Sequence, residues 1–407
     1  MRYVVPYTFL VRDPIVMLDL KTQYMRIKLE IDSAIENVIQ SFEFVNGSHV
    51  DKFSKGLADF LKVKHVIPCG NGTDALQIAI MALQLFPGDE VIVPAYTYVA
   101  TVEVISLLGL KPVFVDVDEH TFTLDIEDLK KKITPKTKLV IPVHLFGQCA
   151  DMEKIRSIAQ EFGFKIIEDT AQAIGAEYYF SNDSHSKAGT IGDFGTTSFF
   201  PSKNLACFGD GGALFTNDDT LAERAKMIAN HGQKQKYHHE IVGCNSRLDS
   251  IQAAILSVKL KYLNDYTKAR QWGAGFYDEL LNNLSGVRLP IRASYSSHVF
   301  NQYTITIDDM VGVNKESFRD HLRRELRKLG VPSMVYYPRP LHLQEAYFSS
   351  DFPKNSLPVS EYLSKSVLSI PIHTEMSRES MITITKAFYV AFETSLSAFQ
   401  KKLHYSQ

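Results

Sequence analysis

Cysteine, tryptophan and long apolar runs are scarce in this chain of 407 residues. The four cysteines form no Cys-x-x-Cys pair and no Cys/His spacing typical of a metal site; they are Cys69, Cys149, Cys207 and Cys244. We therefore expect no disulfide framework, no bound metal and a reducing, cytoplasmic compartment. No apolar run approaches the roughly 18 residues that cross a bilayer, since the nearest, residues 76–86, contains Gln77 and Gln84. A membrane partner is therefore not expected.

An excess of charge of either sign is also missing. Lys and Arg total 44, Asp and Glu total 46, and the formal net charge is −2. Because nucleic-acid binders depend on an excess of basic residues that face phosphates, this balance argues against a nucleic-acid partner. Hydrophobic residues make up 45% of the chain and charged residues 22%, a composition that allows a large buried core.

The first residues form a short apolar stretch, 3–11, behind Arg2. Pro6 interrupts it and no Ala-x-Ala-like cleavage site follows, so a signal peptide is not expected. Two interpretations stay open: residues 1–16 are an N-terminal extension, or the native chain starts at Met17.

Short β-branched runs alternate with helix-period segments between residues 63 and 215. The runs that predict strands are 65–68, 90–93, 113–117, 139–143, 165–168, 196–200 and 213–216. Helices are expected between them, for example at 73–85 and 152–162. Strands that are buried on both faces and joined by helices predict an α/β fold with a mostly parallel sheet between helices. Such sheets bind ligands at the carboxyl ends of their strands.

The pattern changes after a helical stretch at 246–260. The elements expected beyond it are a half-exposed strand at 299–307 and helices at 266–281, 316–329 and 381–399. We therefore expect a large domain over residues 17–265 and a smaller α+β domain over residues 266–407.

Two polar motifs follow expected strands in the first half of the chain. The run Asn71-Gly72-Thr73-Asp74 opens a helix, where a glycine allows close backbone approach and a hydroxyl joins the free N–H groups that bind phosphate. The alternative is an ordinary helix cap. In the second motif, Asp169 directly follows the strand at 165–168, and its carboxylate either serves a ligand or caps the next helix.

A lysine and a helix entrance complete the set of motifs. Lys203 lies among apolar and small residues and precedes a glycine-rich turn at 209–212. Desolvation or a nearby cation would lower the pKa of its amine and make it a nucleophile for Schiff-base chemistry, whereas a surface lysine is the alternative. Asn245 and Arg247 stand at the start of the helix at 246–260, where they bind a ligand or serve as capping and ion-pairing residues.

A phosphate-binding turn, an acid at a strand end and a lysine 34 positions later are together what pyridoxal phosphate requires. These motifs resemble those of the nucleotide-sugar aminotransferases, the DegT/DnrJ/EryC1/StrS family of fold-type I pyridoxal-phosphate enzymes. The resemblance covers residues 17–395 and rests on the strings NGTDALQ, IIEDTAQAIGA and SFFPSKNL followed by GDGGALFTND.

The resemblance implies a role for each matching residue around the cofactor ring. Lys203 would hold the cofactor aldehyde as an imine and then act as the general base and acid of a proton shift. Asp169 would pair with the pyridine nitrogen, and Gln172 would lie near the ring oxygen. Tyr98 would stack on the pyridine ring.

The resemblance also implies how the phosphate is held and how the subunits are arranged. Gly72, Thr73 and Ser198 would hold the phosphate within one subunit. Asn245 would reach the phosphate from the neighbouring subunit. The active sites of a homodimer would therefore be shared between its subunits.

The substrates implied by the resemblance are L-glutamate as the amino donor and a keto-sugar nucleotide as the acceptor. The histidine-rich segment before Asn245 is most similar to the branch that acts on UDP-2-acetamido-2-deoxy-3-keto-glucuronic acid, in surface polysaccharide or lipopolysaccharide biosynthesis. Arg247 or His239 would then pair with the sugar carboxylate. Tyr336 stands where many relatives have histidine, so it would alter the substrate contacts.

Three other functions remain open. The runner-up is a dTDP-3-keto-6-deoxyhexose 3-aminotransferase, because those enzymes share much of the pattern. A pyridoxal-phosphate sugar dehydratase is disfavoured, because such relatives carry histidine at the position of Lys203. A non-catalytic regulator is disfavoured because a binding module has no need for Lys203, Asp169 and Gln172 together.

Overall fold

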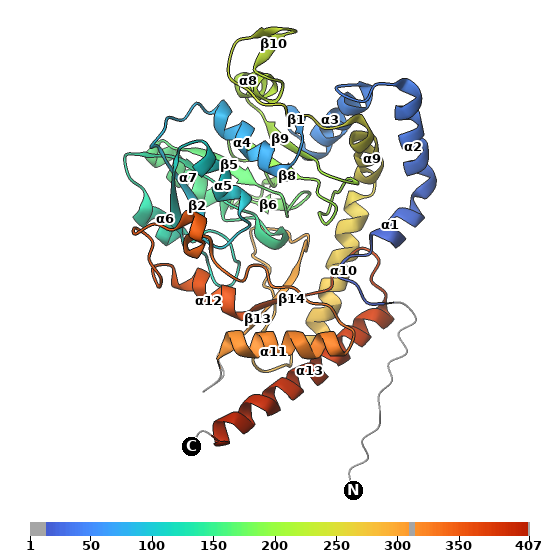
Figure 1. Ribbon diagram of the computed structural model, residues 1–407, viewed down its shortest axis with the longest axis vertical. Coiled ribbons are helices and arrows are strands. Elements are labelled where there is room, and N and C mark those ends of the chain that lie inside the picture. The colour runs from blue at the N-terminus through green and yellow to red at the C-terminus, as the bar shows by residue number, and fades with distance from the viewer. Residues whose placement is uncertain (1–13, 309–313, 406–407) are drawn as a thin grey trace.

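A seven-stranded sheet forms the centre of the protein, seen here in a computed structural model that describes residues 14–308 and 314–405 (Figure 1). Its strand order is β1-β9-β8-β5-β4-β2-β3. The bounds are β1 (His65–Cys69), β2 (Glu90–Pro94), β3 (Lys111–Val115), β4 (Thr137–Val140), β5 (Lys165–Asp169), β8 (Phe194–Ser198) and β9 (Gly212–Thr216). Most of the extension expected at 1–16, namely residues 1–13, lies outside the described residues.

The strand directions confirm a mostly parallel sheet. The pairs β2–β3, β2–β4, β4–β5 and β5–β8 are parallel. Only β9 runs the other way, because it pairs antiparallel with both β1 and β8. Each of the seven strands overlaps a run predicted from the sequence, and the carboxyl ends of β2, β4, β5 and β8 therefore share one edge.

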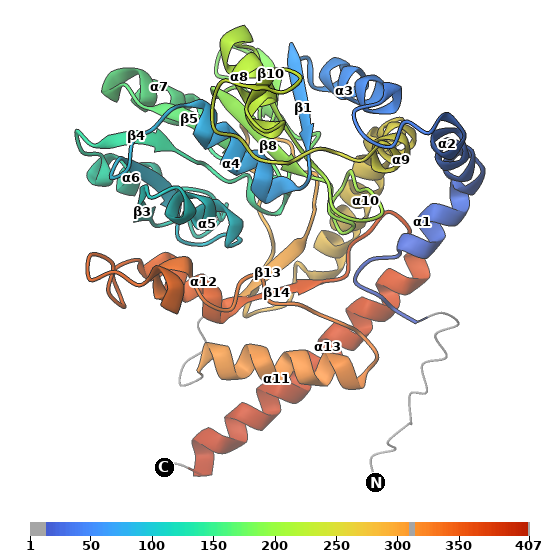
Figure 2. The same ribbon diagram turned by 45° about the horizontal axis from the view of Figure 1, so that its top comes forward.

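Helices cover both faces of the sheet (Figure 2). On β9, Leu214 packs into one hydrophobic cluster with α4 (Gly72–Ala82) and α8 (Asp219–Ala229). Its neighbour Phe215 points the other way, into a second cluster with α3 (Ser48–Leu61) and α9 (Ser250–Leu260). This alternation follows from the two-residue period of a strand and explains why the strands are apolar throughout. The remaining helices of this part are α1 (Leu20–Arg26), α2 (Lys28–Ser41), α5 (Ala100–Leu107), α6 (Ile126–Lys132) and α7 (Met152–Phe162).

A second, smaller sheet lies beyond the long helix α10 (Leu263–Leu281). It consists of β12 (Val287–Arg288), β13 (Tyr303–Ile307) and β14 (Val367–Ile370), and its helices are α11 (Lys315–Lys328), α12 (Pro358–Ser366) and α13 (Arg378–Tyr405). α10 runs through residue 265 without a break, and its carboxyl-terminal half packs into the hydrophobic cluster of the smaller sheet. The division into domains at this residue stays a prediction.

The half-exposed strand expected at 299–307 is wrong in its start and in its exposure. β13 begins only at Tyr303, and each of its five residues is buried. One face joins the hydrophobic cluster through Tyr303, Ile305 and Ile307. The other face carries Thr304, whose hydroxyl lies 2.8 Å from that of Ser369 on β14. Hydroxyls that pair across the strands allow the polar face to be buried, which alternation alone does not reveal.

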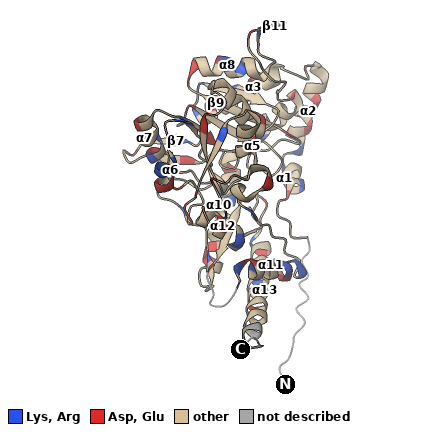
Figure 3. Ribbon diagram, turned by 60° about the vertical axis from the view of Figure 1, so that its left-hand side comes forward, with Lys and Arg blue, Asp and Glu red and all other residues tan. Residues whose placement is uncertain are grey.

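Two hairpins stand apart from the two sheets. One is β6 (Glu177–Tyr179) with β7 (His185–Lys187), and the other is β10 (Gln233–Gln235) with β11 (His238–His239). The β10–β11 hairpin projects beyond α8 at one end of the molecule (Figures 1 and 3). Neither hairpin is predicted from the sequence, because both are short and rich in polar residues.

Charged residues of both signs are interspersed along the helices, for example on α6 and α11 (Figure 3). Within the described ranges, none of the helices combines the length and apolar character that a membrane span needs. Across the same ranges, no three His, Cys, Asp or Glu side chains are grouped so that they could hold a metal ion.

Candidate active site

A cavity of about 410 Å³ opens at the edge where β2, β4, β5 and β8 end. It contains most of the site residues expected from the sequence: Gly72, Thr73, Tyr98, Asp169, Gln172, Ser198, Lys203 and Tyr336. Its position agrees with the rule that open α/β sheets bind ligands beyond the carboxyl ends of their strands. The cavity therefore brings together expected site residues that are up to 264 positions apart in the chain, namely Gly72 and Tyr336.

The first turn of α4 forms one wall of the cavity. Asn71 caps the helix, because its side chain accepts a hydrogen bond from the backbone N–H of Asp74 at 2.8 Å. A Cβ atom on Gly72 would lie 2.7 Å from Cβ of Ser198 at the end of β8, so only glycine allows this approach. The N-terminus of α4 thus opens into the cavity beside the hydroxyl-bearing residues Thr73 and Ser198. Free N–H groups and hydroxyls suit a phosphate.

Asp169 ends β5 with a fixed and buried carboxylate. Its Oδ2 accepts a hydrogen bond from Oγ1 of Thr101 at 3.0 Å, and its Oδ1 accepts one from the backbone N–H of Ala171 at 3.0 Å. The side chain borders the cavity, although the residue is only 7% exposed. These donors hold the carboxylate in one orientation, ready to accept a proton-bearing nitrogen.

A buried Glu168–His144 pair supports Asp169 from behind. The two oxygens of Glu168 accept hydrogen bonds from the backbone N–H groups of Gly189, Ile191 and Gly192 at 2.7 to 2.9 Å. His144 Nδ1 accepts from a backbone N–H, so its proton lies on Nε2, which donates to Glu168 at 2.9 Å. The backbone N–H of His144 in turn donates to the carbonyl of Asp169 at 3.0 Å.

Gln172 is anchored on both sides of its amide. Its Oε1 accepts a hydrogen bond from the backbone N–H of Phe146 at 2.8 Å, and its Nε2 donates to the hydroxyl of Tyr337 at 3.0 Å. The ring of Tyr337 lies 6.1 Å from the ring of Tyr98, which borders the cavity and is itself 56% exposed. An exposed aromatic face inside a cavity is available for a planar ligand.

Lys203 projects from the turn after β8 into the same cavity. Burial lowers the pKa of its amine below the ordinary value of 10.5, and the carboxylate of Asp169 opposes part of that shift. The amine therefore loses its proton more readily than the amine of a solvent-exposed lysine does. A neutral amine is the form that attacks an aldehyde.

Three residues that border the cavity are not predicted from the sequence. Thr97, Tyr337 and Asn301 all border it. Thr97 directly precedes Tyr98, and Tyr337 directly follows Tyr336, so adjacency to an expected site residue is the signal that could have found them. Asn301 has no such signal, because it comes from a segment between α10 and β13.

The residues of the cavity fit pyridoxal phosphate. The cradle between Gly72 and Ser198 suits its phosphate, Asp169 suits a protonated ring nitrogen, and Lys203 suits its aldehyde. Thr97 adds an independent observation. Its hydroxyl is buried at the cavity and has no hydrogen-bond partner within the described part of the chain. A buried hydroxyl without a partner costs about 1–3 kcal/mol, which a polar ligand would relieve.

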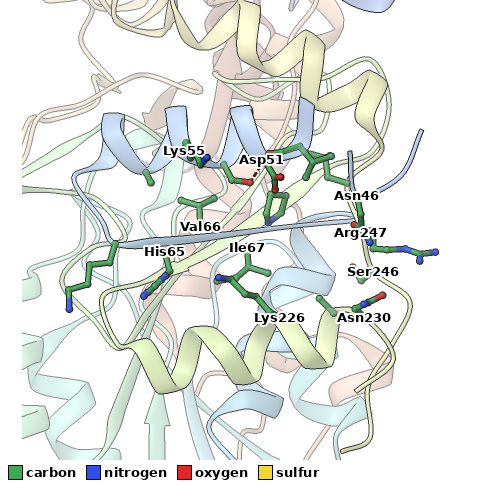
Figure 4. Close-up of a pocket in the computed structure, with 17 residues that line it drawn as sticks. Asn46, Asp51, Lys55, His65, Val66, Ile67, Lys226, Asn230, Ser246 and Arg247 are labelled. Carbon is green, nitrogen blue, oxygen red and sulfur yellow. Dashed lines mark hydrogen bonds between the residues drawn. The ribbon is translucent and has the colours of Figure 1, made fainter. Parts of the chain in front are cut away.

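Three expected site residues do not border this cavity. Asn245 is exposed and forms an isolated antiparallel bridge with Asn230. Arg247 borders a different hollow of about 410 Å³ between α3 and α8, where its guanidinium points away from the other labelled side chains (Figure 4). His239 lies exposed on β11, with its Nδ1 2.8 Å from the carbonyl oxygen of His231.

Comparison with known proteins gives consistent matches along the chain. A model of the DegT/DnrJ/EryC1/StrS aminotransferase family matches residues 25–389. A pleiotropic regulatory protein from Geobacillus stearothermophilus is 45% identical over 365 residues, which cover 89% of this chain and 94% of that protein. UDP-2-acetamido-2-deoxy-3-oxo-D-glucuronate aminotransferase from Pseudomonas aeruginosa is 44% identical over 370 residues, which cover 91% of this chain and 98% of that enzyme.

Solved structures agree with the sequence matches. The crystal structure of DesV from S. venezuelae, in complex with a ketimine intermediate, superposes with a TM-score of 0.87 at 38% identity. The match covers 94% of this chain and 98% of DesV. The resemblance stated from the motifs is thereby confirmed, and so is the expected fold class. The protein belongs to the DegT/DnrJ/EryC1/StrS aminotransferase family.

Proposed function

We propose that this pyridoxal-phosphate-dependent aminotransferase moves an amino group from L-glutamate to a keto-sugar nucleotide, with UDP-2-acetamido-2-deoxy-3-keto-glucuronic acid as the acceptor. The product would serve the biosynthesis of a surface polysaccharide or lipopolysaccharide in the cytoplasm. One observation carries the chemistry: Lys203, with its lowered pKa, shares a cavity with the carboxylate of Asp169 and with the phosphate cradle at Gly72.

Each residue of the cavity has one task in this function. When bound, pyridoxal phosphate supplies an electron sink for the carbon that loses a proton. Asp169 keeps the proton on the ring nitrogen, and Thr101 and the Glu168–His144 pair keep Asp169 in place. Lys203 would take the proton from the carbon of the donor that bears the amino group and return it two atoms along, across the nitrogen, with its amine as the base and then the acid. Tyr98, which borders the cavity, would cover one face of the ring and exclude water from it.

The phosphate end of the cavity binds and orients without taking part in proton transfer. The helix N-terminus at Gly72 and the hydroxyls of Thr73 and Ser198 would bind the phosphate. Gln172 is fixed between Phe146 and Tyr337, and it would orient the ring by lying near the oxygen that the ring carries. With the phosphate and the ring both held, the cofactor would keep the same position relative to the amine of Lys203 in both half-reactions.

The protein would act as a homodimer with shared active sites. Asn245 and Arg247 lie outside the cavity of their own subunit, and the neighbouring β10–β11 hairpin projects from the body of the chain (Figure 3). This arrangement supports a loop that completes the cavity of the partner. Asn245 would reach the phosphate there, and Arg247 would meet the acceptor.

The choice of acceptor depends on the sugar carboxylate. Arg247, and His239 on the projecting hairpin, could both pair with a uronic acid once they lie in the partner's cavity. Tyr336 already borders its own cavity and would contact the sugar. The P. aeruginosa relative acts, by its name, on the same uronic acid, which supports this choice over the dTDP-3-keto-6-deoxyhexose.

The name of the G. stearothermophilus relative favours a second candidate function, a non-catalytic regulator. A regulator would keep the fold and could lose the chemistry. Burial lowers the pKa of Lys203, and the charge of Asp169 acts on its amine. Both features belong to a catalytic site and argue for retained catalysis. Turnover by the purified protein decides between the two functions.

The test is mass spectrometry of the products formed with L-glutamate and a panel of keto-sugar nucleotides. We expect amination of the UDP-linked 3-keto-uronic acid, and Arg247→Ala should lower kcat/KM for it about 100-fold, since a desolvated charge pair is lost. The same variant should leave amination of a 6-deoxy-sugar nearly unchanged. Turnover of a dTDP-3-keto-6-deoxyhexose alone would overturn the choice of acceptor, and no turnover of any acceptor would favour the regulator.

A further inference from the structure

Two buried asparagines bind the turn that carries Lys203 to a segment almost a hundred positions away. Asn204 directly follows the lysine, and Asn301 lies between α10 and β13; each is 5% exposed. Nδ2 of Asn301 donates to Oδ1 of Asn204 at 3.1 Å and approaches the carbonyl oxygen of Ser202 at 3.4 Å. Nδ2 of Asn204 donates to the carbonyl oxygen of Val299 at 3.0 Å. We call Asn204 and Asn301 the amide clasp.

The clasp determines its own amide orientations. The backbone N–H of Val299 already donates to Gly147, so Val299 offers Asn204 only its carbonyl oxygen, and Asn204 must turn its NH₂ group toward it. The oxygen of Asn204 then faces Asn301, which must supply an NH₂ group in return. The two side chains thus fit in a single arrangement and grip both neighbours of Lys203, namely Ser202 and Asn204.

The segment on the far side of the clasp is itself rigidly held. Arg270 on α10 is buried, and its Nη1 donates to the carbonyl oxygens of Phe300 at 3.0 Å, Asn301 at 3.4 Å and Ile372 at 3.0 Å. Phe300 adopts φ +47°, a left-handed conformation that costs a non-glycine residue about 1–3 kcal/mol and persists only when its surroundings enforce it. The clasp therefore connects the turn that carries Lys203 to a rigid segment, residues 299–301.

The same segment also touches the anchor of Gln172. The backbone N–H of Val299 donates to the carbonyl of Gly147 at 2.8 Å, next to Phe146, whose N–H holds Gln172. A Cβ on Gly147 would lie 2.8 Å from the backbone nitrogen of Phe300, so the two backbones meet closely. The segment 299–301 is thus a common support for Lys203 and Gln172.

We propose that Asn204 and Asn301 are positioning residues for Lys203: they hold the turn 202–204 so that the lysine amine meets the cofactor aldehyde. The inference rests on the proposed role of Lys203 as the residue that links to the cofactor. Neither asparagine takes part in proton transfer. They act through the backbone on each side of the lysine, and Arg270 keeps their support in place.

The test compares Asn301→Ala, Asn204→Ala and the double variant with Thr304→Val. The control removes a different buried hydrogen bond, the one between Thr304 and Ser369 in the smaller sheet, and therefore reports a loss of stability alone. In cofactor-free protein, we expect amide hydrogen exchange at 202–204 to rise about tenfold in the clasp variants, because local opening no longer breaks the clasp. The control should leave this exchange unchanged.

A second readout is the rate at which added pyridoxal phosphate becomes linked to Lys203. Borohydride trapping followed by peptide mass spectrometry measures it. We expect a fall of about tenfold in each single variant and no further fall in the double variant, because the two amides act as one unit. If Asn301→Ala does not fold, Asn301→Ser, matched to the control by its unfolding temperature, provides the same comparison.

The outcomes separate the clasp from the role of Lys203. Unchanged exchange and linking in the clasp variants, or equal changes in Thr304→Val, would overturn the positioning role. If wild-type protein traps the cofactor at a residue other than Lys203, the proposed role of Lys203 fails. The exchange measurement in cofactor-free protein then still decides whether the clasp holds the turn.

Discussion

At the scale of single residues, the chemistry depends on the amine of Lys203, whose pKa is set by two opposing influences, burial and the carboxylate of Asp169. Burial lowers the pKa of Lys203, whereas the negative charge of Asp169 raises it. Asp169 is itself held by Thr101 and by the backbone of Ala171. The amine is therefore easily deprotonated, but it is less so than it would be without the acid.

This opposition predicts a pH effect of Asp169→Asn. Lys203 links to pyridoxal phosphate only when its amine is neutral, so linking should rise with pH through a midpoint below 10.5 in the wild-type protein. Because the Asp169 carboxylate raises the pKa of Lys203, its removal should shift that midpoint to lower pH. Borohydride trapping across a pH series measures the midpoint.

Asp59→Asn on α3 is the matched control, because it removes a carboxylate that is exposed and does not border the cavity. It should leave the midpoint unchanged. An upward shift in Asp169→Asn, or an equal shift in the control, would show that the two groups do not interact as described.

The local motifs were readable from the sequence, whereas their supports were not. Gly72, Asp169 and Lys203 each stand in a recognisable run, and each borders the cavity. Thr97 has an isolated hydroxyl whose burial only the fold reveals. The role of Asn301 can be recognised only in the fold, where it lies beside Asn204, because no motif surrounds it in the sequence.

At the scale of elements, the contact between α4 and β8 shapes the phosphate cradle. Gly72 at the first turn of α4 packs directly against Ser198 at the end of β8. The cradle therefore depends on a helix and a strand that meet without an intervening side chain. The same contact brings the free N–H groups of the helix to the cavity.

Gly72→Ala tests this contact. The added Cβ would meet Cβ of Ser198 at 2.7 Å and its Cα at 3.3 Å, so α4 or β8 must move. We expect the free energy of unfolding to fall by about 1–3 kcal/mol. The dissociation constant of pyridoxal phosphate should rise at least roughly tenfold, since a shift of the cradle removes about one hydrogen bond to a charged group. Chemical denaturation and a cofactor titration measure the two effects.

Gly275→Ala in α10 is the control, because a Cβ there meets nothing within 4 Å. It should stabilise the protein by about 0.5–1 kcal/mol through the gain in helix propensity. Cofactor affinity should stay at the wild-type value. Wild-type affinity in Gly72→Ala would mean that the close packing is not part of the phosphate site.

The elements themselves were predictable to different degrees. Each of the seven central strands overlaps a predicted run, because strands that are buried on both faces appear as continuous apolar segments. The order of these strands and the reversed direction of β9 follow from long-range pairing that no local pattern encodes. The helix expected at 246–260 begins at Ser250, since residues 245–249 remain in an extended loop.

At the scale of the whole molecule, the loop 245–249, which carries Asn245, does not border the cavity of its own chain. Asn245 is exposed, does not border the cavity of Lys203, and forms its bridge with Asn230 just before the β10–β11 hairpin. The proposed homodimer joins the two parts across subunits. Each site would then need Lys203 from one chain and Asn245 from the other.

Subunit mixing tests the shared site. Lys203→Ala and Asn245→Ala proteins should each be weakly active or inactive alone. A heterodimer contains one site with both native residues, so random mixing should restore about a quarter of the wild-type sites. Steady-state activity measures the recovery, with mass spectrometry of the intact dimers as the proof of exchange. No recovery after verified exchange would show that the sites are not shared.

The role of Lys203 in amino transfer is tested most directly by following the amino nitrogen itself. The measurement is mass spectrometry of the sugar nucleotide after incubation with ¹⁵N-labelled L-glutamate, pyridoxal phosphate and the UDP-linked 3-keto-uronic acid. The expected result is a ¹⁵N-labelled amino sugar with wild-type protein and none with Lys203→Ala, which lacks the amine that carries the proton. Label transfer at the wild-type rate by Lys203→Ala would contradict the role given to this lysine.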